Sequence, residues 1–212
     1  RLLLNRAVQA AVIENGAEVI LGEGLAYDRC SVGIVTNIAP DEEDLSRWDV
    51  QPTGGEYYTT PRSIYRTQVD VVLPSGHAVL NAEDELVADF AELCDGEVIF
   101  FAVDPANPVL VAHLAAGKRG VTVADNRIVL RSGSDETRLC RLIDAPYIGK
   151  AKQAKHIANV LAGIAAGWAL GLSQEVMTTG LKTFGLELAD PASLILSPAK
   201  KSQPKKPATA RK

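Results

Sequence analysis

The sequence has 212 residues, of which 47% are hydrophobic and 23% charged, and its formal net charge is −4. These values are typical of a globular protein with one domain or at most two, large enough to bury a core without disulfides. No apolar stretch is long and uninterrupted enough to span a membrane, and no signal peptide opens the chain. The cysteines are scattered without C-x-x-C spacing, which argues against a zinc site and predicts reduced cysteines in a cytoplasmic protein.

The net charge conceals an asymmetry between the body of the chain and its end. Residues 199–212 hold six basic residues and no acid, which leaves 16 bases against 26 acids, or −10, in the rest. We expect a domain over residues 1–188 and a disordered basic Pro/Lys tail over 189–212. Such a tail suits a polyanion, or it is a solvated segment left by a frameshift or read-through. The −10 body argues against nucleic acid as a partner.

The first half of the chain contains several short apolar runs. Val8–Ile13 predicts a short strand, and the β-branched run Ser31–Ile38 predicts a buried parallel strand. Val69–Leu73 predicts another strand, closed by residues 74–76, and Ala78–Leu80 predicts a third.

A helix is expected to follow, from a cap at Asn81 to about Cys94. Acidic residues 83–85 would then occupy its first turn, where the helix dipole favours anions. Glu97–Val103 predicts the next strand. Strand, helix and strand at this spacing are typical of a βαβ unit.

The second half predicts an antiparallel element and then helices. Val121–Val123 and Ile128–Arg131 flank Asp125-Asn126, which suits a tight hairpin turn, and Leu139–Ile143 predicts a further strand. The 3.6-residue periodicity predicts a helix over Gln153–Leu170, ended by Gly171, and Ser173 would cap another helix through about Phe184. The predicted fold class is α/β: a mostly parallel sheet flanked by helices, with a small antiparallel β element.

Three long segments are more specific than a general α/β pattern: AVIENGAEVILGEGLAYDRCSVGIVTNI (11–38), RTQVDVVLPSGHAVLNAEDELVADFAELCDGEVIFF (66–101) and NVLAGIAAGWALGL (159–172). In sequence order, all three resemble segments of the cyanophycin synthetases. These enzymes join an ATP-grasp half to a Mur-ligase-like half and polymerise aspartate and arginine. The resemblance therefore implies the central, nucleotide-binding domain of a Mur-type ligase, with ATP and Mg²⁺ as cofactors.

The resemblance also implies roles for individual residues. Glu14 matches the acidic residue that binds magnesium beside the ATP γ-phosphate, and Thr36 and Asn37 match the pair that opens the catalytic loop. Asn159 matches the asparagine that reads the adenine edge, and His156 lies one helical turn before it.

Each of these residues also has an ordinary structural interpretation. Glu14 suits a surface turn, and Asn37 suits an Asx-turn. Asn159 suits a hydrogen bond within its helix, and His156 suits a partly exposed helix position. His77 and His113 lack partners at metal-ligand spacing and are interpreted as structural.

The sequence departs from the family pattern in four respects. It contains no G-x-x-G-K-[ST] phosphate-binding loop. The loop at Ala39–Leu45 is acidic but lacks the histidine of the family's Asp-His pair. Ala17, Glu18, Val19 and Gly22 stand where Arg, Gly, Gly and Arg are expected. The family's C-terminal lobe is also not found before the basic tail.

The leading hypothesis is therefore a truncated or degenerate ligase domain that keeps the fold without independent activity. A non-catalytic module that binds a full-length synthetase or the cyanophycin polymer is the alternative. A Rossmann dehydrogenase is disfavoured because no G-x-G-x-x-G motif follows a strand. The oligomeric state stays open.

Overall fold

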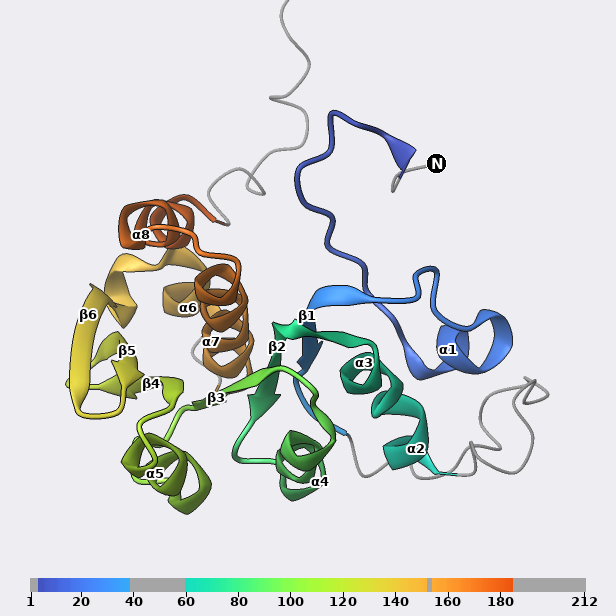
Figure 1. The fold of residues 1–212 in the computed structure, drawn as a ribbon. Coiled ribbons are helices and arrows are strands. Elements are labelled where there is room, and N and C mark those ends of the chain that lie inside the picture. Colours follow the sequence, from blue (N-terminus) through green and yellow to red (C-terminus); the bar gives the residue numbers. More distant parts are fainter. Residues whose placement is uncertain (1–3, 39–59, 152–153, 185–212) are drawn as a thin grey trace, which may run out of the picture.

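The computed structural model describes residues 4–38, 60–151 and 154–184, and the side chains of 149–155 lie outside this description. The described residues form a six-stranded sheet with helices on both faces (Figure 1). The strands, in spatial as in chain order, are β1 (Cys30–Val35), β2 (Val72–Asn81), β3 (Glu97–Ala102), β4 (Arg119–Ala124), β5 (Arg127–Ser132) and β6 (Asp135–Arg141). The first four are parallel, and the last two continue the same sheet as antiparallel strands. The predicted fold class is thus confirmed.

The helices divide between the two faces of this sheet. They are α1 (Ala17–Glu23), α2 (Pro61–Tyr65), α3 (Thr67–Asp70), α4 (Glu85–Ala88), the 3₁₀ helix η5 (Asp89–Leu93), α5 (Pro108–Ala115), the 3₁₀ helix η6 (Leu142–Asp144), α6 (Pro146–Ala151), α7 (Ala154–Ala169) and α8 (Gln174–Thr183). α7 packs across β1 to β4 on one face, and α3, α4, η5 and α5 lie on the other. Among the described helices, none has the length and hydropathy that a membrane-spanning helix requires.

The alternation of side chains along the strands builds one core on each face. In β3, Ile99 and Phe101 belong to the core under α7, whereas Phe100 and Ala102 belong to the core under α4 and α5. Successive side chains of a strand point to opposite faces, so a strand covered on both faces is apolar throughout. This explains the continuous apolar run of β3.

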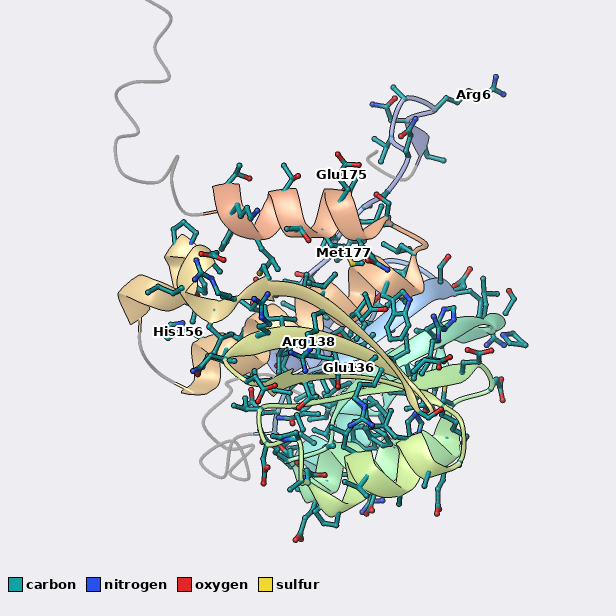
Figure 2. The ribbon with its side chains drawn as sticks, turned by 90° about the vertical axis from the view of Figure 1, so that its left-hand side faces the viewer. Arg6, Glu136, Arg138, His156, Glu175 and Met177 are labelled. Atoms are coloured by element: carbon teal, nitrogen blue, oxygen red, sulfur yellow. The ribbon has the colours of Figure 1, made fainter. Side chains whose placement is uncertain are left out.

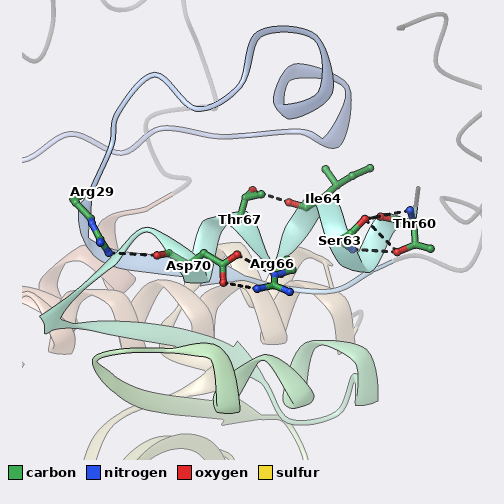
Figure 3. Close-up of polar contacts among 7 residues, drawn as sticks. All are labelled: Arg29, Thr60, Ser63, Ile64, Arg66, Thr67 and Asp70. Atoms are coloured by element: carbon green, nitrogen blue, oxygen red, sulfur yellow. Dashed lines mark hydrogen bonds and ion pairs between the residues drawn. The ribbon is translucent and has the colours of Figure 1, made fainter. Parts of the chain in front are cut away.

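Residues 60–70 form two short helices where the sequence predicts a strand from Val69 (Figure 3). Thr60 and Ser63 form a reciprocal capping box that starts α2. The Thr67 hydroxyl then donates to the Ile64 carbonyl at 2.6 Å, and Arg66 pairs with Asp70 across one helical turn at 2.9 Å. These local bonds favour helix over strand for Val69, so β2 begins only at Val72.

Two strand predictions in the first half are wrong. Residues 8–13 have no regular secondary structure, because β1 pairs only with β2 in the described sheet and no partner strand holds them. Only Val72 and Leu73 of the first predicted segment are in a strand, and they belong with Ala78–Leu80 to a single strand, β2. Its pairing jumps from Cys30↔Val72 to Val32↔His77, so residues 73–76 form an irregular excursion within the strand rather than its end.

The predicted helix from Asn81 to Cys94 is also wrong in its start and its length. Asn81 is the last residue of β2, and the cap is Asp84, which accepts the Val87 amide. Only α4 is α-helical, and the chain continues as the 3₁₀ helix η5. α5, which Asn107 caps and Pro108 begins, was not predicted from the sequence.

The later elements follow the sequence more closely. Asp125 and Asn126 adopt positive φ angles of 48° and 56°, as the β4–β5 hairpin turn requires. β6 begins earlier than predicted, at Asp135, because Gly133 with φ 58° turns the chain directly after β5. Gly171 has φ 76° and ends the α7 helix, as predicted. Ser173 caps α8 by accepting the Val176 amide.

Candidate functional site

The carboxyl ends of the parallel strands meet at one edge of the sheet. Thr36 and Asn37 follow β1, Asn81 ends β2, and Asp104 lies just beyond β3. Open α/β sheets bind ligands at this edge, so it is the candidate site. Thr36 is half-buried, and Asn37 is exposed.

Asn81 connects the end of β2 to the end of β1. Its side chain is nearly buried, and its Nδ2 donates to the Thr36 carbonyl oxygen at 2.9 Å. Its Oδ1 accepts the Glu83 amide at 2.9 Å. A buried amide side chain needs both a donor and an acceptor partner, and Asn81 finds both in the backbone.

Asp84 bonds to two backbone amides in different segments. Oδ2 accepts the Ile38 N–H at 2.8 Å, and Oδ1 accepts the Val87 N–H at 3.1 Å, which caps α4. Hydrogen bonds to a carboxylate are stronger than those between neutral groups. Sequence reasoning placed this acid in a first helical turn and missed its contact with the β1 loop.

Two further side chains extend these contacts to β3. Glu83 Oε1 accepts the Asp104 amide at 2.8 Å. Asn107 Nδ2 donates to the Ala82 carbonyl oxygen at 3.1 Å, while its Oδ1 caps α5. The loops that follow β1, β2 and β3 are thus joined by side chain–backbone hydrogen bonds.

Glu14 lies in an irregular segment before α1, and its side chain is exposed. The adjacent Asn15 is anchored, since its Nδ2 donates to the Tyr27 hydroxyl at 2.8 Å and to Gln68 Oε1 at 3.5 Å. Within the described ranges no three acidic, histidine or cysteine side chains cluster as a metal site. A single carboxylate still fits Mg²⁺, which takes one or two protein oxygens and completes its shell with phosphate and water.

The orientation of α7 brings its first turns toward the candidate edge. Trp168, near the end of α7, stacks on Arg119, the first residue of β4, with 5.0 Å between Cζ and the ring centroid. The end of α7 therefore lies over the amino ends of the strands. His156 and Asn159, in the first half of α7, consequently lie toward the carboxyl ends. Asn159 is exposed there, and His156 is half-buried.

His156 belongs to a small aromatic cluster, and its position is labelled in Figure 2. Its Nδ1 lies 3.0 Å from the Tyr147 hydroxyl, and the two rings meet edge-to-face. Tyr147 also packs edge-to-face on Phe184, which directly follows α8. On α8 itself, Met177 lies on the side that faces the domain and Glu175 on the opposite side (Figure 2). No hydrogen bond among the described residues joins Glu14, His156 or Asn159 to Thr36 or Asn37.

The other histidines occupy structural positions away from this edge. His113 is buried, its Nε2 lies 3.1 Å from the Val98 carbonyl oxygen, and burial lowers its pKa. His77, on β2, lies beside Glu97 of β3. Its pKa is lowered mainly by burial and to a smaller extent by the nearby positive charge of Arg119. Burial raises the pKa of each cysteine thiol, and none of the three forms a disulfide. Cys140 is buried, whereas Cys30 and Cys94 are half-buried.

No protein-family model matches the chain. Individual proteins do match it. The chain is 33% identical to a cyanophycin synthetase of Synechocystis sp. and 31% identical to that of Crocosphaera subtropica. Each match covers 86% of this chain and 20% of the relative. The chain is homologous to one segment of cyanophycin synthetase. The UDP-N-acetylmuramoylalanine–D-glutamate ligase of Symbiobacterium thermophilum is 30% identical over 69% of the chain and 29% of that enzyme.

These matches confirm the resemblance to cyanophycin synthetases and Mur ligases. The chain spans about a fifth of the length of the cyanophycin synthetases it matches. Two of the features predicted from the sequence, the acidic loop Ala39–Leu45 and the tail 189–212, lie outside the described residues. The division into a domain over 1–188 and a tail over 189–212 therefore stays a prediction.

Proposed function

We propose that this chain forms the nucleotide-binding part of a ligase of the cyanophycin synthetase type, which adds aspartate and arginine to a growing polymer. Homology to cyanophycin synthetases and Mur ligases supports an ATP-dependent amide-forming ligase family. The observation that carries the proposal is that residues from β1 and α7 lie toward the same edge of the sheet. Thr36 and Asn37 follow β1 at the edge toward which α7 directs Asn159.

In the proposed reaction a substrate carboxylate takes the γ-phosphoryl group of ATP, with ADP leaving, and becomes an acyl phosphate. An amine then attacks the acyl carbon, and phosphate leaves as the amide bond forms. Asn159 would bind the adenine edge with its amide donor and acceptor, helped by the neighbouring His156. Thr36 and Asn37 would contact the reacting groups at the strand end. Glu14 would hold Mg²⁺, which offsets the phosphate charge when bound.

The structure of α1 bears on how strongly this site would bind phosphate. Where the family pattern has arginines and glycines, α1 buries Ala17 against Ile64 of α2 and exposes Glu18 in its first turn. Arginines would supply bidentate hydrogen bonds to phosphate oxygens, and a carboxylate cannot. We therefore propose weak MgATP binding and no complete reaction by residues 1–212 alone, which contain no G-x-x-G-K-[ST] motif.

Calorimetric titration of the purified chain with MgATP tests the proposal. Asn159→Ala should weaken binding about tenfold, as expected for removal of a specific hydrogen-bonding pair. Gln174→Ala removes a different exposed amide, on α8, and should leave the MgATP affinity unchanged. Glu14→Gln should reduce the dependence of MgATP binding on Mg²⁺, and Glu175→Gln, an exposed acid on α8, serves as its matched control. Equal MgATP affinity in the wild type and Asn159→Ala would contradict the assignment of Asn159.

A polymerisation assay tests the second half of the proposal. The chain is incubated with ATP, Mg²⁺, aspartate, arginine and a polymer primer, and release of phosphate and growth of the primer are measured. We expect neither from residues 1–212 alone. Primer growth would overturn the proposed inactivity. Capture of a full-length synthetase or of the polymer without any MgATP binding, lost on deleting residues 199–212, would instead favour a non-catalytic interaction module.

A further inference from the structure

The backbone on both sides of Asn37 is held by side chains from a neighbouring strand end. The carbonyl oxygen of the preceding residue, Thr36, accepts Asn81 Nδ2 at 2.9 Å. The amide of the following residue, Ile38, donates to Asp84 Oδ2 at 2.8 Å. Ile38 is buried beside this contact, whereas Asn37 itself is exposed.

We propose that Asn81 and Asp84 are positioning residues that fix Asn37 for its role at the candidate site. The peptide groups flanking one residue offer an acceptor on one side and a donor on the other. Asn81 supplies the N–H that the Thr36 carbonyl needs, and Asp84 supplies the oxygen that the Ile38 amide needs. Because the carbonyl before Asn37 and the amide after it are both hydrogen-bonded, the backbone of Asn37 cannot rotate freely. Its side chain nevertheless stays exposed and open to a ligand.

The two positioning side chains are themselves held. Asn81 is nearly buried, and its Oδ1 accepts the Glu83 amide. The second oxygen of Asp84 caps α4 through Val87. Glu83 in turn accepts the Asp104 amide beyond β3. A functional residue keeps its geometry when the side chains that support it are locked by their own contacts, and here that support reaches across three strands.

A general structural role for Asp84 can be separated from the positioning role, because its two oxygens serve different segments. Serine is a good helix N-cap, so Asp84→Ser retains an acceptor for the Val87 amide. Its single short hydroxyl cannot also reach the Ile38 amide. Asp84→Ala loses both contacts. Glu85→Gln, at the next position, changes charge by the same amount as Asp84→Ser and serves as the control.

Amide hydrogen exchange measured by NMR is the first test. In Asp84→Ser the Ile38 amide should exchange about tenfold faster, as expected for loss of one hydrogen bond to a charged group. The Val87 amide should stay near its wild-type rate, and Glu85→Gln should change neither amide. Asn81→Asp is a second variant, which removes the donor to the Thr36 carbonyl. It should also accelerate hydrogen exchange of the Ile38 amide. An unchanged Ile38 rate in Asp84→Ser overturns the proposal.

The second test rests on the proposed function and uses MgATP as the probe. We expect Asp84→Ser to weaken MgATP binding about tenfold, because the loss of one charge-assisted hydrogen bond would release Asn37. If the wild type binds MgATP and Asp84→Ser binds it equally well, Asn37 is not being positioned for this ligand and the inference fails. If the wild type does not bind MgATP, the proposed function fails. The exchange rates alone then test whether Asn81 and Asp84 fix the backbone of Asn37.

Discussion

Arg119 and Trp168 join the sheet to α7 through a cation–π contact, with the guanidinium carbon 5.0 Å from the ring centroid. The same guanidinium pairs with Glu97 Oε2 on β3 at 2.9 Å. The contact lies at the amino ends of the strands, opposite the candidate edge. It shows which end of α7 lies over the amino ends of the strands, and therefore at which end Asn159 lies.

Arg119→Met should lower the free energy of unfolding by about 1 kcal/mol, because it keeps an apolar stem but removes the cation–π contact and a partly exposed ion pair. Urea unfolding measures the change. Arg62→Met is the control, since Arg62 pairs with Asp89 at 3.1 Å with both side chains largely exposed. A loss in Arg62→Met as large as in Arg119→Met would mean that the Trp168 contact contributes nothing. The Ile38 amide exchange should not respond to either change.

Two glycine-to-alanine substitutions should have opposite effects. A Cβ at Gly33 of β1 would overlap the Gln68 carbonyl oxygen and lie 2.8 Å from Val72 Cγ2. Gly33→Ala should therefore destabilise the fold by about 1–3 kcal/mol, as overpacking does. A Cβ at Gly163 in the middle of α7 meets no atom within 4 Å. Gly163→Ala should stabilise by about 0.5–1 kcal/mol, because alanine favours helix over glycine. Thermal unfolding of the two variants checks both signs.

The end of α7 depends on the left-handed conformation of Gly171. Its φ is 76°, its amide donates to the Trp168 carbonyl at 3.0 Å, and the Leu172 amide donates to the Gly167 carbonyl at 2.9 Å. This pair of bonds is a Schellman motif. Gly171→Ala should cost about 1 kcal/mol, because a Cβ is strained at this φ. Gly171→Asn should cost less, since asparagine tolerates the conformation. Urea unfolding that shows equal stability for wild type and Gly171→Ala would contradict this.

Protonation of the buried His113 should destabilise the fold in acid. Burial lowers its pKa below the unfolded value of 6.5. The unfolded chain therefore binds protons more strongly than the folded chain, and the free energy of unfolding falls as pH drops through about 6.5 toward the folded pKa. His113→Gln keeps an N–H donor for the Val98 carbonyl and does not titrate. Urea unfolding at about pH 7.5 and pH 5.5 should show a smaller acid loss in His113→Gln, with His77 supplying part of what remains.

The sequence predicted those elements whose causes are local. The positive φ angles of Asp125 and Asn126 follow from the turn preference of these two residues. Gly171 ends α7 through its backbone conformation, and Ser173 begins α8 through its side chain, so each boundary depends on a single residue. β1 and β3 were predictable because strands covered on both faces are apolar throughout. The run Val69–Leu73 misled, because its β-branched residues favour a strand while Arg66, Thr67 and Asp70 hold its beginning as helix.

The candidate site was harder to predict for a related reason. Asn81 and Asp84 have the residue types of helix caps, and the sequence alone placed both at the start of one helix. Their partners, Thr36 and Ile38, are more than 40 positions away, and only the parallel pairing of β1 with β2 brings them together. The positions of Glu14, Thr36, Asn37, His156 and Asn159 came from a family resemblance, and their roles await the binding experiments.

The spatial order of the strands matches their order along the chain from β1 to β6. Each strand therefore pairs with its neighbour in sequence, and the longest connection that strand pairing must close is residues 36–71, between β1 and β2. α7 comes after all six strands and returns across β1 to β4. The contacts of α7 with β1 therefore join elements that are far apart in sequence, and forming them closes a long stretch of chain. Substitutions beneath α7 should slow folding more than equally destabilising substitutions in the β4–β6 meander, provided that α7 is already docked in the transition state.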